Sequence, residues 1–216
     1  MSETEQSNPF DAETLAVLPE YLAKLPNPVL LRIWGDPEAS TGEKEAARLA
    51  EGLVNGFEQI EMALLPRQVN YPYYPVLGVF GFDQDEAVDF GVRLIGLPAG
   101  VQMTSLIAAI QAVSFAGGTL EAKTRIQLSK LQEDITLELL SSAEDESGAT
   151  MARALFGLAV ASSHIRSFLI MGDQFPEALW RYSVSYLPHL VVNGRVHADG
   201  QLGEEMILRQ IALALR

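Results

Sequence analysis

The chain has 216 residues, 48% of them hydrophobic, and its 28 acidic residues outnumber its 15 basic ones for a net charge of −13. This length is enough for one large domain or two of about 100 residues each. The negative charge repels phosphate backbones and anionic lipids, so neither nucleic acid nor a membrane is expected as a partner. The chain contains no cysteine, which excludes disulfides, thiol catalysis, thiolate zinc sites and iron–sulfur clusters, and we expect no cofactor.

The beginning of the chain is polar and acidic. The first residues, MSETEQSNPF, lack the cationic start and apolar core of a signal peptide. No apolar run approaches the roughly 18 residues of a membrane span, so we expect a cytoplasmic location. Residues 11–26 then carry four leucines at helical spacing after a cap-capable Asp11, and Pro19 is expected to interrupt this short helix.

Strands and helices alternate in the rest of the chain. In the first half, strands are expected at 28–34, 57–65, 75–82 and 92–98, and helices at 43–56 and 102–118. In the second half, helices are expected at 121–133, 150–164, 175–183 and 203–216, and strands at 135–140, 166–171 and 186–195. The second half repeats the order of the first, which predicts an internal structural repeat. One doubly wound sheet is the alternative, but the chain lacks its Gly-rich phosphate loop.

The stretch SSAEDESGAT, residues 141–150, is called the acidic turn below. It joins an expected strand to an expected helix, where many α/β folds carry their chemistry. Its candidate side chains are Ser141, Ser142, Glu144, Asp145, Glu146, Ser147 and Thr150. The serines lack the Gly-flanked elbow of a nucleophile, and the acids lack the spaced ligands of a calcium loop. Carboxylates stabilise a helix N-terminus by about 0.3–1 kcal/mol each, which explains the acids without a ligand.

The three histidines, His164, His189 and His197, all lie in the second half. No pair of them has metal-site spacing, such as four residues apart on a helix, so we expect structural or surface roles. Nearby, Asn193 and Gly194 lie between apolar residues, which predicts an antiparallel hairpin that Pro188 opens. Both halves thus place a proline at the start of a late strand.

Three stretches in this order, EYLAKLPNPVLL, GLPAGVQMTSLIAAIQ and LPHLVVNGR, resemble the N-terminal domain of the flavoprotein subunit of alkyl hydroperoxide reductase. They resemble the prokaryotic protein disulfide oxidoreductases more distantly, and the resemblance covers nearly the whole chain from about residue 15. It implies an α/β fold of two tandem thioredoxin-like, or glutaredoxin-like, units at 11–118 and 119–216. Each unit would have a mixed central sheet flanked by helices.

In that family the second unit keeps a Cys-x-x-Cys at the strand-to-helix turn, facing a cis-proline. Overlaid without a gap, the two cysteine positions fall on Asp145 and Gly148, with Glu146 and Ser147 between them. Pro188, after Leu187, takes the cis-proline position, and Pro75, after Tyr74, takes the corresponding position in the first unit. The resemblance therefore implies that both X-Pro bonds are cis.

Disulfide exchange needs a thiolate, which neither a carboxylate nor a glycine can replace. We therefore expect a redox-inactive binding or adaptor protein. Its binding residues would be Leu187, Pro188, Tyr74 and Pro75 together with Glu144, Asp145, Glu146, Ser147 and Gly148. They would hold an extended, basic segment of another protein. The alternatives are a structural or oligomerising protein and a non-thiol enzyme that pairs Asp145 or Glu146 with a histidine; the sequence leaves the oligomeric state open.

Overall fold

The computed structural model describes residues 12–118 and 120–216. The polar lead, the expected cap Asp11 and the expected unit boundary at Thr119 lie outside the described residues. The helices are α1 (Ala12–Leu22), α2 (Thr41–Gly56), α3 (Met103–Ser114), α4 (Ala122–Leu128), α5 (Glu146–Ala161), α6 (Pro176–Arg181) and α7 (Glu204–Ala214), with a 3-10 turn η1 (Gly100–Gln102) before α3. The strands are β1 (Val29–Trp34), β2 (Ile60–Leu65), β3 (Val76–Asp83), β4 (Glu86–Ile95), β5 (Ile135–Ser141), β6 (Ile165–Met171), β7 (His189–Val192) and β8 (Val196–Asp199).

Several element boundaries differ from the sequence-based prediction. Helix α1 runs through Pro19, so the expected interruption is wrong. The burial of Leu18 and Leu22 on both sides of Pro19 offsets the backbone hydrogen bond that a proline cannot donate. Strand β4 begins six residues earlier than expected because a tight turn at Gln84, with φ of 54°, folds it back on β3. Helix α5 begins four residues earlier than expected because Asp145 caps it. Helices α3 and α4 end earlier than expected, and β2 starts three residues later.

All eight strands form one continuous mixed sheet in the order β2-β1-β3-β4-β6-β5-β7-β8. The first half contributes β2-β1-β3-β4 and the second half β6-β5-β7-β8, so the same strand order occurs twice. In each half a parallel pair is followed by an antiparallel hairpin. The halves join where β4 pairs with β6 in parallel register, from Val92 opposite Ser167. The sheets expected for the two units are therefore fused edge to edge, and the result is not a doubly wound parallel sheet.

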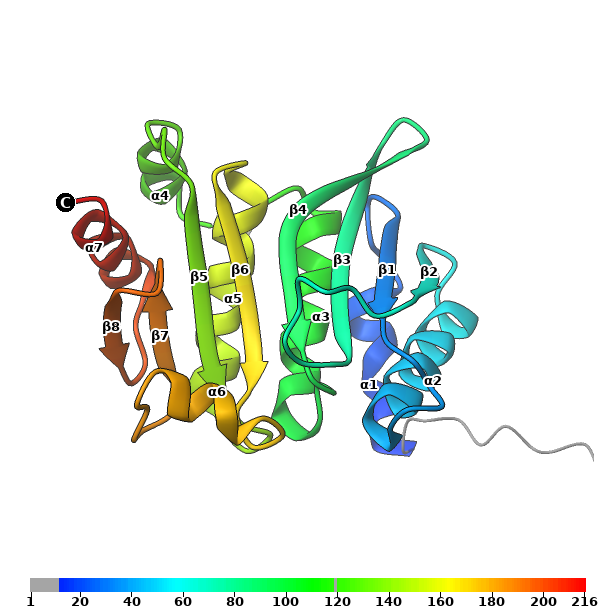
Figure 1. Cartoon of the computed structure of the whole chain (residues 1–216). Helices are drawn as coiled ribbons and strands as arrows, with labels where there is room; N and C mark the ends of the chain where they lie inside the picture. Colours follow the sequence, from blue (N-terminus) through cyan, green and yellow to red (C-terminus); the bar gives the residue numbers. More distant parts are fainter. Residues whose placement is uncertain (1–11, 119) are drawn as a thin grey trace, which may run out of the picture.

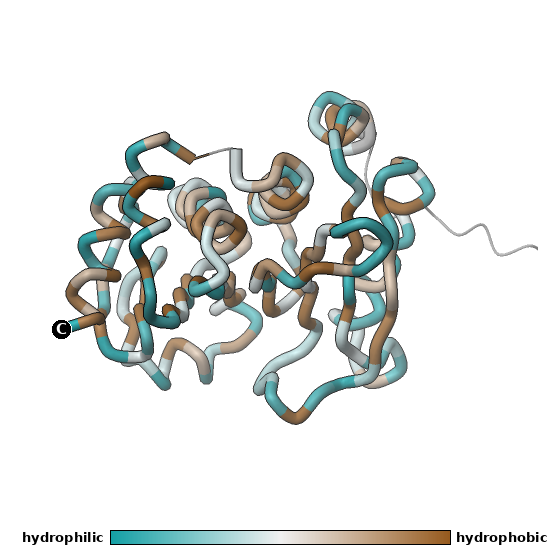
Figure 2. Tube along the Cα trace, turned by 90° about the horizontal axis from the view of Figure 1, so that it is seen from above, coloured by the Kyte–Doolittle hydropathy of each residue, from teal (hydrophilic) through white to brown (hydrophobic). Residues whose placement is uncertain are grey.

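A layer of helices covers one face of this sheet. Helices α3 and α5 lie behind the strands in Figure 1 and pack against each other. Figure 2, which looks along the strands, shows this helical layer on one side of the sheet. The main core lies between the sheet and this layer, where residues such as Leu31, Leu137 and Phe156 are buried. Apolar residues alternate along β5, as expected for a strand with one face in this core.

The opposite face of the sheet carries a smaller core. It contains Trp34, Phe80, Leu140 and Val191, and it is covered by residues of the loop before β3 and of the α6 region. In Figure 1 both of these segments pass in front of the sheet. This face is therefore only partly covered.

The predicted hairpin is confirmed: β7 and β8 are antiparallel, with Val192 opposite Val196. Asn193 and Gly194 both have positive φ, 51° and 64°, as a tight primed turn requires. Within the described residues, no helix has the length and apolar character needed to cross a bilayer.

Candidate functional site

The acidic turn begins at Ser141, the last residue of the buried strand β5, and runs into α5. Asp145 is the N-cap of α5: its Oδ1 accepts a hydrogen bond from the Gly148 N–H at 2.8 Å, and its Oδ2 accepts one from the Ser141 hydroxyl at 2.8 Å. The two positions assigned to the cysteines are thus bonded to each other through a carboxylate. The expectation that these acids serve the helix N-terminus is confirmed for Asp145. Glu144 and Glu146 are exposed, and Ser147 is half-buried.

Gly148 leaves no space for a side chain. A Cβ placed there would lie 2.0 Å from Ser141 Oγ and 2.5 Å from Asp145 Oδ2. The room that a second cysteine would need is therefore occupied by a serine and a carboxylate. A variant with Asp145→Cys and Gly148→Cys, which tests the overlay, would also need a shorter side chain at Ser141.

A glutamine from the first half of the chain completes this network. The side chain of Gln102 is fully buried, and its Nε2 lies 3.0 Å from Ser141 Oγ, 2.9 Å from the Ser142 carbonyl and 3.0 Å from the Asp145 carbonyl. Its Oε1 accepts a hydrogen bond from the Ser105 hydroxyl. Sequence reasoning missed Gln102, because its partners lie about 40 residues away along the chain and no local pattern marks it. This hydrogen-bond network therefore connects the acidic turn of the second half to Gln102 of the first half.

The histidines fall into two groups. His189 is buried on β7; its Nδ1 lies 2.7 Å from Asp199 Oδ1, and its Nε2 lies 2.9 Å from His197 Nδ1. His197 is on β8, the second strand of the hairpin. His164 Nδ1 lies 3.0 Å from Asp134 Oδ1. Within the part of the chain that the structure describes, no histidine bonds to the acidic turn, so the acid–histidine pair of the enzyme alternative is not formed.

Metal ligation finds no support in the described residues: no group of three or more His, Asp or Glu side chains there is placed to hold an ion.

Pro75 and Pro188, whose peptide bonds were predicted to be cis, occupy equivalent places in the two halves. The Tyr74-Pro75 and Leu187-Pro188 peptide bonds are both cis. The Pro75 carbonyl accepts a hydrogen bond from the Gly96 N–H at 2.8 Å, and the Pro188 carbonyl accepts one from the Gly200 N–H at 2.9 Å. Both glycines have positive φ, 100° and 77°, a conformation that glycine adopts without strain.

Pro188 is linked to the acidic turn through the residue after Gly200. Gln201 Oε1 lies 3.4 Å from the Ser147 hydroxyl, and Gly200 is bonded to the Pro188 carbonyl. The structure thus brings Pro188 and the first turn of α5 to one end of the sheet. The Tyr74-Pro75 bond belongs to the other half, where Pro75 Cδ lies 3.8 Å from the place of a Cβ on Gly42 in α2. The predicted binding residues therefore form two separate groups.

The group around Pro75 contains a buried acid that the sequence reasoning did not select. Glu43 of α2 is 1% exposed and accepts hydrogen bonds from the Asp36 N–H, the Ser40 hydroxyl and the Arg67 guanidinium. The bonds from Arg67 are the largest cause that lowers the Glu43 pKa to about 2, against the raising effect of burial. The Ser-x-x-Glu spacing at 40–43 is a visible capping box, whereas Arg67 carries no local signal. The Glu43 carboxylate is thus hydrogen-bonded within the protein, and it holds the turn before α2 in place.

Two large aromatic side chains are exposed in the segment before Leu187: Tyr186 directly precedes it, and Trp180 comes seven residues earlier. Trp180, on α6, is 75% exposed, and Tyr186 is 74% exposed. Aromatic side chains are enriched at protein interfaces, where their burial contributes much of the binding energy. The backbone N–H and C=O of Leu187 make no backbone hydrogen bond within the described residues. This segment therefore presents apolar side chains and free backbone groups together.

Sequence comparison relates the chain to parts of larger proteins. It is 24% identical over 202 residues to the F subunit of alkyl hydroperoxide reductase in Pseudomonas aeruginosa, a match that covers 94% of this chain and 37% of that protein. It is 22% identical over 202 residues to an NADH dehydrogenase of Bacillus subtilis, covering 94% and 38%. The chain thus spans well under half the length of these curated relatives. No protein-family model matches it.

Structural comparison covers the whole fold. The N-terminal NTD_N/C domain of alkyl hydroperoxide reductase AhpF from Enterococcus faecalis superposes with a TM-score of 0.84 at 17% identity, covering 93% of this chain and 98% of that one. The fold is the tandem thioredoxin-like fold. A protein disulfide oxidoreductase from Aeropyrum pernix has the same tandem thioredoxin-like fold, with a TM-score of 0.80 at 20% identity, covering 95% and 94%. The present chain differs in having no cysteine, so its thioredoxin-like fold lacks the atoms for thiol–disulfide exchange.

Proposed function

We propose that this protein is a redox-inactive thioredoxin-fold binding protein that holds an extended segment of another protein beside Leu187 and Pro188. The observation that carries the proposal is the free backbone of Leu187 at the end of a segment that exposes the aromatic side chains of Trp180 and Tyr186. An extended segment can pair with such backbone groups as an added strand, and the aromatic rings offer apolar contact. This mode of binding needs no cysteine.

Charge favours a basic segment. Glu144 and Glu146 are exposed in the acidic turn, which is linked to Pro188 through Ser147 and Gln201. The whole chain also carries a net charge of −13. Exposed charges at the rim of an interface steer association and select partners more than they add affinity. We also propose a cytoplasmic location, which imaging of a tagged full-length chain would test.

Site-specific photo-crosslinking tests the position of the site. A benzophenone side chain replaces Tyr186 in one variant and Tyr21, which is 43% exposed on α1, in a matched control. After irradiation in native cell extract, the Tyr186 variant should form an adduct with a discrete protein, mapped to one extended segment. Adding Trp180→Ala should reduce the yield. Equal labelling from both positions, or no adduct from Tyr186, would contradict the proposal.

The recovered partner then allows a test of the charge argument. The variant Glu144→Gln with Glu146→Gln should slow association and flatten its salt dependence. The control Glu58→Gln with Glu61→Gln removes the same charge from exposed positions near β2 and should leave association unchanged. Asp145 is kept, because its loss would also remove the cap of α5. Equal effects of the two variants would reduce the role of the acidic turn to net charge.

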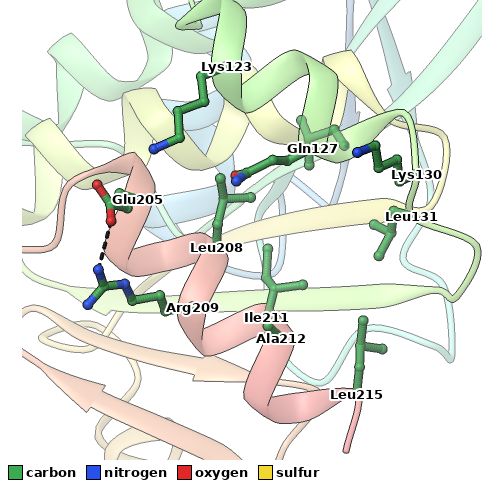
Figure 3. A pocket seen from close by; sticks show the side chains of 11 residues that line it. Lys123, Gln127, Lys130, Leu131, Glu205, Leu208, Arg209, Ile211, Ala212 and Leu215 are labelled. Carbon is green, nitrogen blue, oxygen red and sulfur yellow. Dashed lines mark hydrogen bonds and ion pairs between the residues drawn. The ribbon is translucent and has the colours of Figure 1, made fainter.

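A second candidate is an oligomerising role through α4 and α7. A cavity of about 360 Å³ lies between these helices, as Figure 3 shows, with Leu208 and Ile211 on its apolar side and Lys123 and Lys130 at its edge. Exposed apolar side chains lie on the same two helices: Ile126 is 61% exposed, Met206 40% and Leu213 48%. An apolar surface of this kind is typical of an interface.

Light scattering tests the second candidate. The parent protein should form a dimer whose mass falls to that of the monomer at low concentration, and Ile126→Lys should shift it to the monomer. The variant Tyr186→Lys, exposed elsewhere, is the matched control and should leave the mass unchanged. A parent protein that stays monomeric at all concentrations would exclude this role.

A further inference from the structure

A cavity lies on the sheet face opposite the helical layer. Its volume is about 620 Å³, within the range of about 300–1,000 Å³ typical of small-molecule sites. Residues from both halves line it. The segment from Asn70 to Tyr73 belongs to the loop before β3, Phe168 lies on β6, and Tyr182 directly follows α6. Leu187 does not line this sheet-face cavity, so a ligand bound there would be independent of the proposed segment binding.

Two segments of the described chain cover parts of this face and leave the cavity between them. They meet where Tyr73 of the first half stacks on Phe175 of the second, with ring centroids 4.9 Å apart and planes at 20°. The stacked pair ties the loop before β3 to the start of α6. Between these two segments the strands β4 and β6 form the floor, with Ile95, Phe168 and Ile170 lining the cavity. These three side chains make part of the floor apolar, and Tyr71, Tyr73 and Tyr182 add aromatic rings to the lining.

Two arginines line the sheet-face cavity without a direct ion pair. Arg166 lies close enough to Asp89 to help lower the pKa of that carboxyl, which is itself paired with Arg93. Arg166 of β6 and Arg181 of α6 are both exposed, and neither forms an ion pair or a hydrogen bond to an acid within the described residues. The Arg181 guanidinium lies over the Tyr182 ring at 5.0 Å from its centroid. By contrast, Arg67, Arg93 and Arg209 each pair with a carboxylate.

The one acid that lines the sheet-face cavity is already engaged. Glu138 of β5 accepts a hydrogen bond from the Tyr182 hydroxyl at 2.6 Å. Burial and the bond to Glu138 raise the pKa of Tyr182 to about 12, so this hydroxyl keeps its proton at neutral pH and continues to donate to Glu138. In a chain with a net charge of −13, a cavity lined by two guanidinium groups that make no direct ion pair, and by one carboxylate that accepts from Tyr182, is a local site for an anion.

We propose that the sheet-face cavity binds a flat organic anion, a carboxylate joined to an aromatic or conjugated body. The carboxylate faces Arg166 and Arg181, whose planar guanidinium groups match its geometry. The flat body lies against Phe168 and Tyr182, because aromatic rings stack with one another in offset or edge-on contact. The ligand is thus recognised by charge and by shape at once.

Binding of 2-naphthoate to the ¹⁵N-labelled full chain, followed by NMR, tests this proposal. The probe carries both features, 2-naphthalenemethanol carries only the flat body, and acetate carries only the charge. We expect saturable shifts of amide signals around the sheet-face cavity with 2-naphthoate, and at least tenfold weaker binding of the other two. Failure of 2-naphthoate to bind, or equal binding of 2-naphthalenemethanol, would overturn the proposal.

Substitution of the arginines locates the site. The variant Arg166→Gln with Arg181→Gln should bind 2-naphthoate at least tenfold more weakly, while keeping the dispersed amide spectrum of a folded chain. The control Arg125→Gln with Arg153→Gln removes the same charge from exposed positions on α4 and α5 and should bind like the parent. Unchanged affinity of the first variant would overturn the assignment. The variant Trp180→Ala should leave 2-naphthoate binding intact, which separates this result from the segment-binding proposal.

Discussion

The substitution Gly148→Ala should destabilise the protein although it places a better helix former in a helix. In an unhindered helical position this change would stabilise by about 1 kcal/mol. Here the new Cβ would lie 2.0 Å from Ser141 Oγ and 2.9 Å from Ser141 Cβ. The serine must move, which breaks its hydrogen bonds to Asp145 and Gln102. Overpacking costs about 1–3 kcal/mol and each lost bond about 1 kcal/mol, so the expected net loss is about 2–4 kcal/mol.

Urea unfolding followed by circular dichroism measures this loss. At about 2–4 °C per kcal/mol for a chain of this size, the melting temperature should also fall by roughly 5–15 °C. The control is Gly56→Ala, because nothing lies within 4 Å of a Cβ at that helical glycine, and it should be neutral or slightly stabilising. In a double-mutant cycle, Ser141→Ala should reduce the cost of Gly148→Ala by at least about 1 kcal/mol. A Gly148→Ala variant as stable as the parent would refute the steric argument.

Three further outcomes are expected. In an insulin-reduction assay the protein should match the blank, because it has no cysteine; activity above the blank would contradict this. The Glu43 pKa is lowered to about 2, so the stability contributed by its charged form should be complete above about pH 4.5 and lost as the pH falls toward 2. Arg67→Gln should reduce this loss, because the bonds from Arg67 are the largest cause of the lowered pKa; an equally steep acid unfolding curve in that variant would show that other groups cause it. In a spectrophotometric titration Tyr182 should ionise near pH 12, and Glu138→Gln should lower that pKa; an unchanged high-pH component would contradict the assignment.

Local patterns in the sequence predicted much of the fold. The short apolar pattern at 135–140 marked β5. Asn193 with Gly194 marked the β7–β8 hairpin, because a tight turn with positive φ depends on its own residues. The role of Asp145 at a helix start could also be predicted, since capping involves neighbours three residues apart. The boundary of β4 was missed, because the turn before it has Gln84, and not the usual glycine, at the position with positive φ.

By itself, the sequence determined what this protein cannot do. Without a sulfur nucleophile at any of its 216 positions, no folding of the chain can perform thiol–disulfide exchange. It also determined the local elements, because helix caps, turns and strand alternation depend on residues a few positions apart. These features survive in any arrangement of the elements.

The tertiary structure decided what surrounds the candidate sites. The burial of Gln102 against Ser141, the pairing of Arg67 with Glu43, and the placing of Arg166 and Arg181 around one cavity all join distant parts of the chain. So does the fusion of the two sheets through β4 and β6. No local propensity encodes such contacts, because they form only when packing of the core fixes the orientation of each strand and helix, and with it the direction of every side chain.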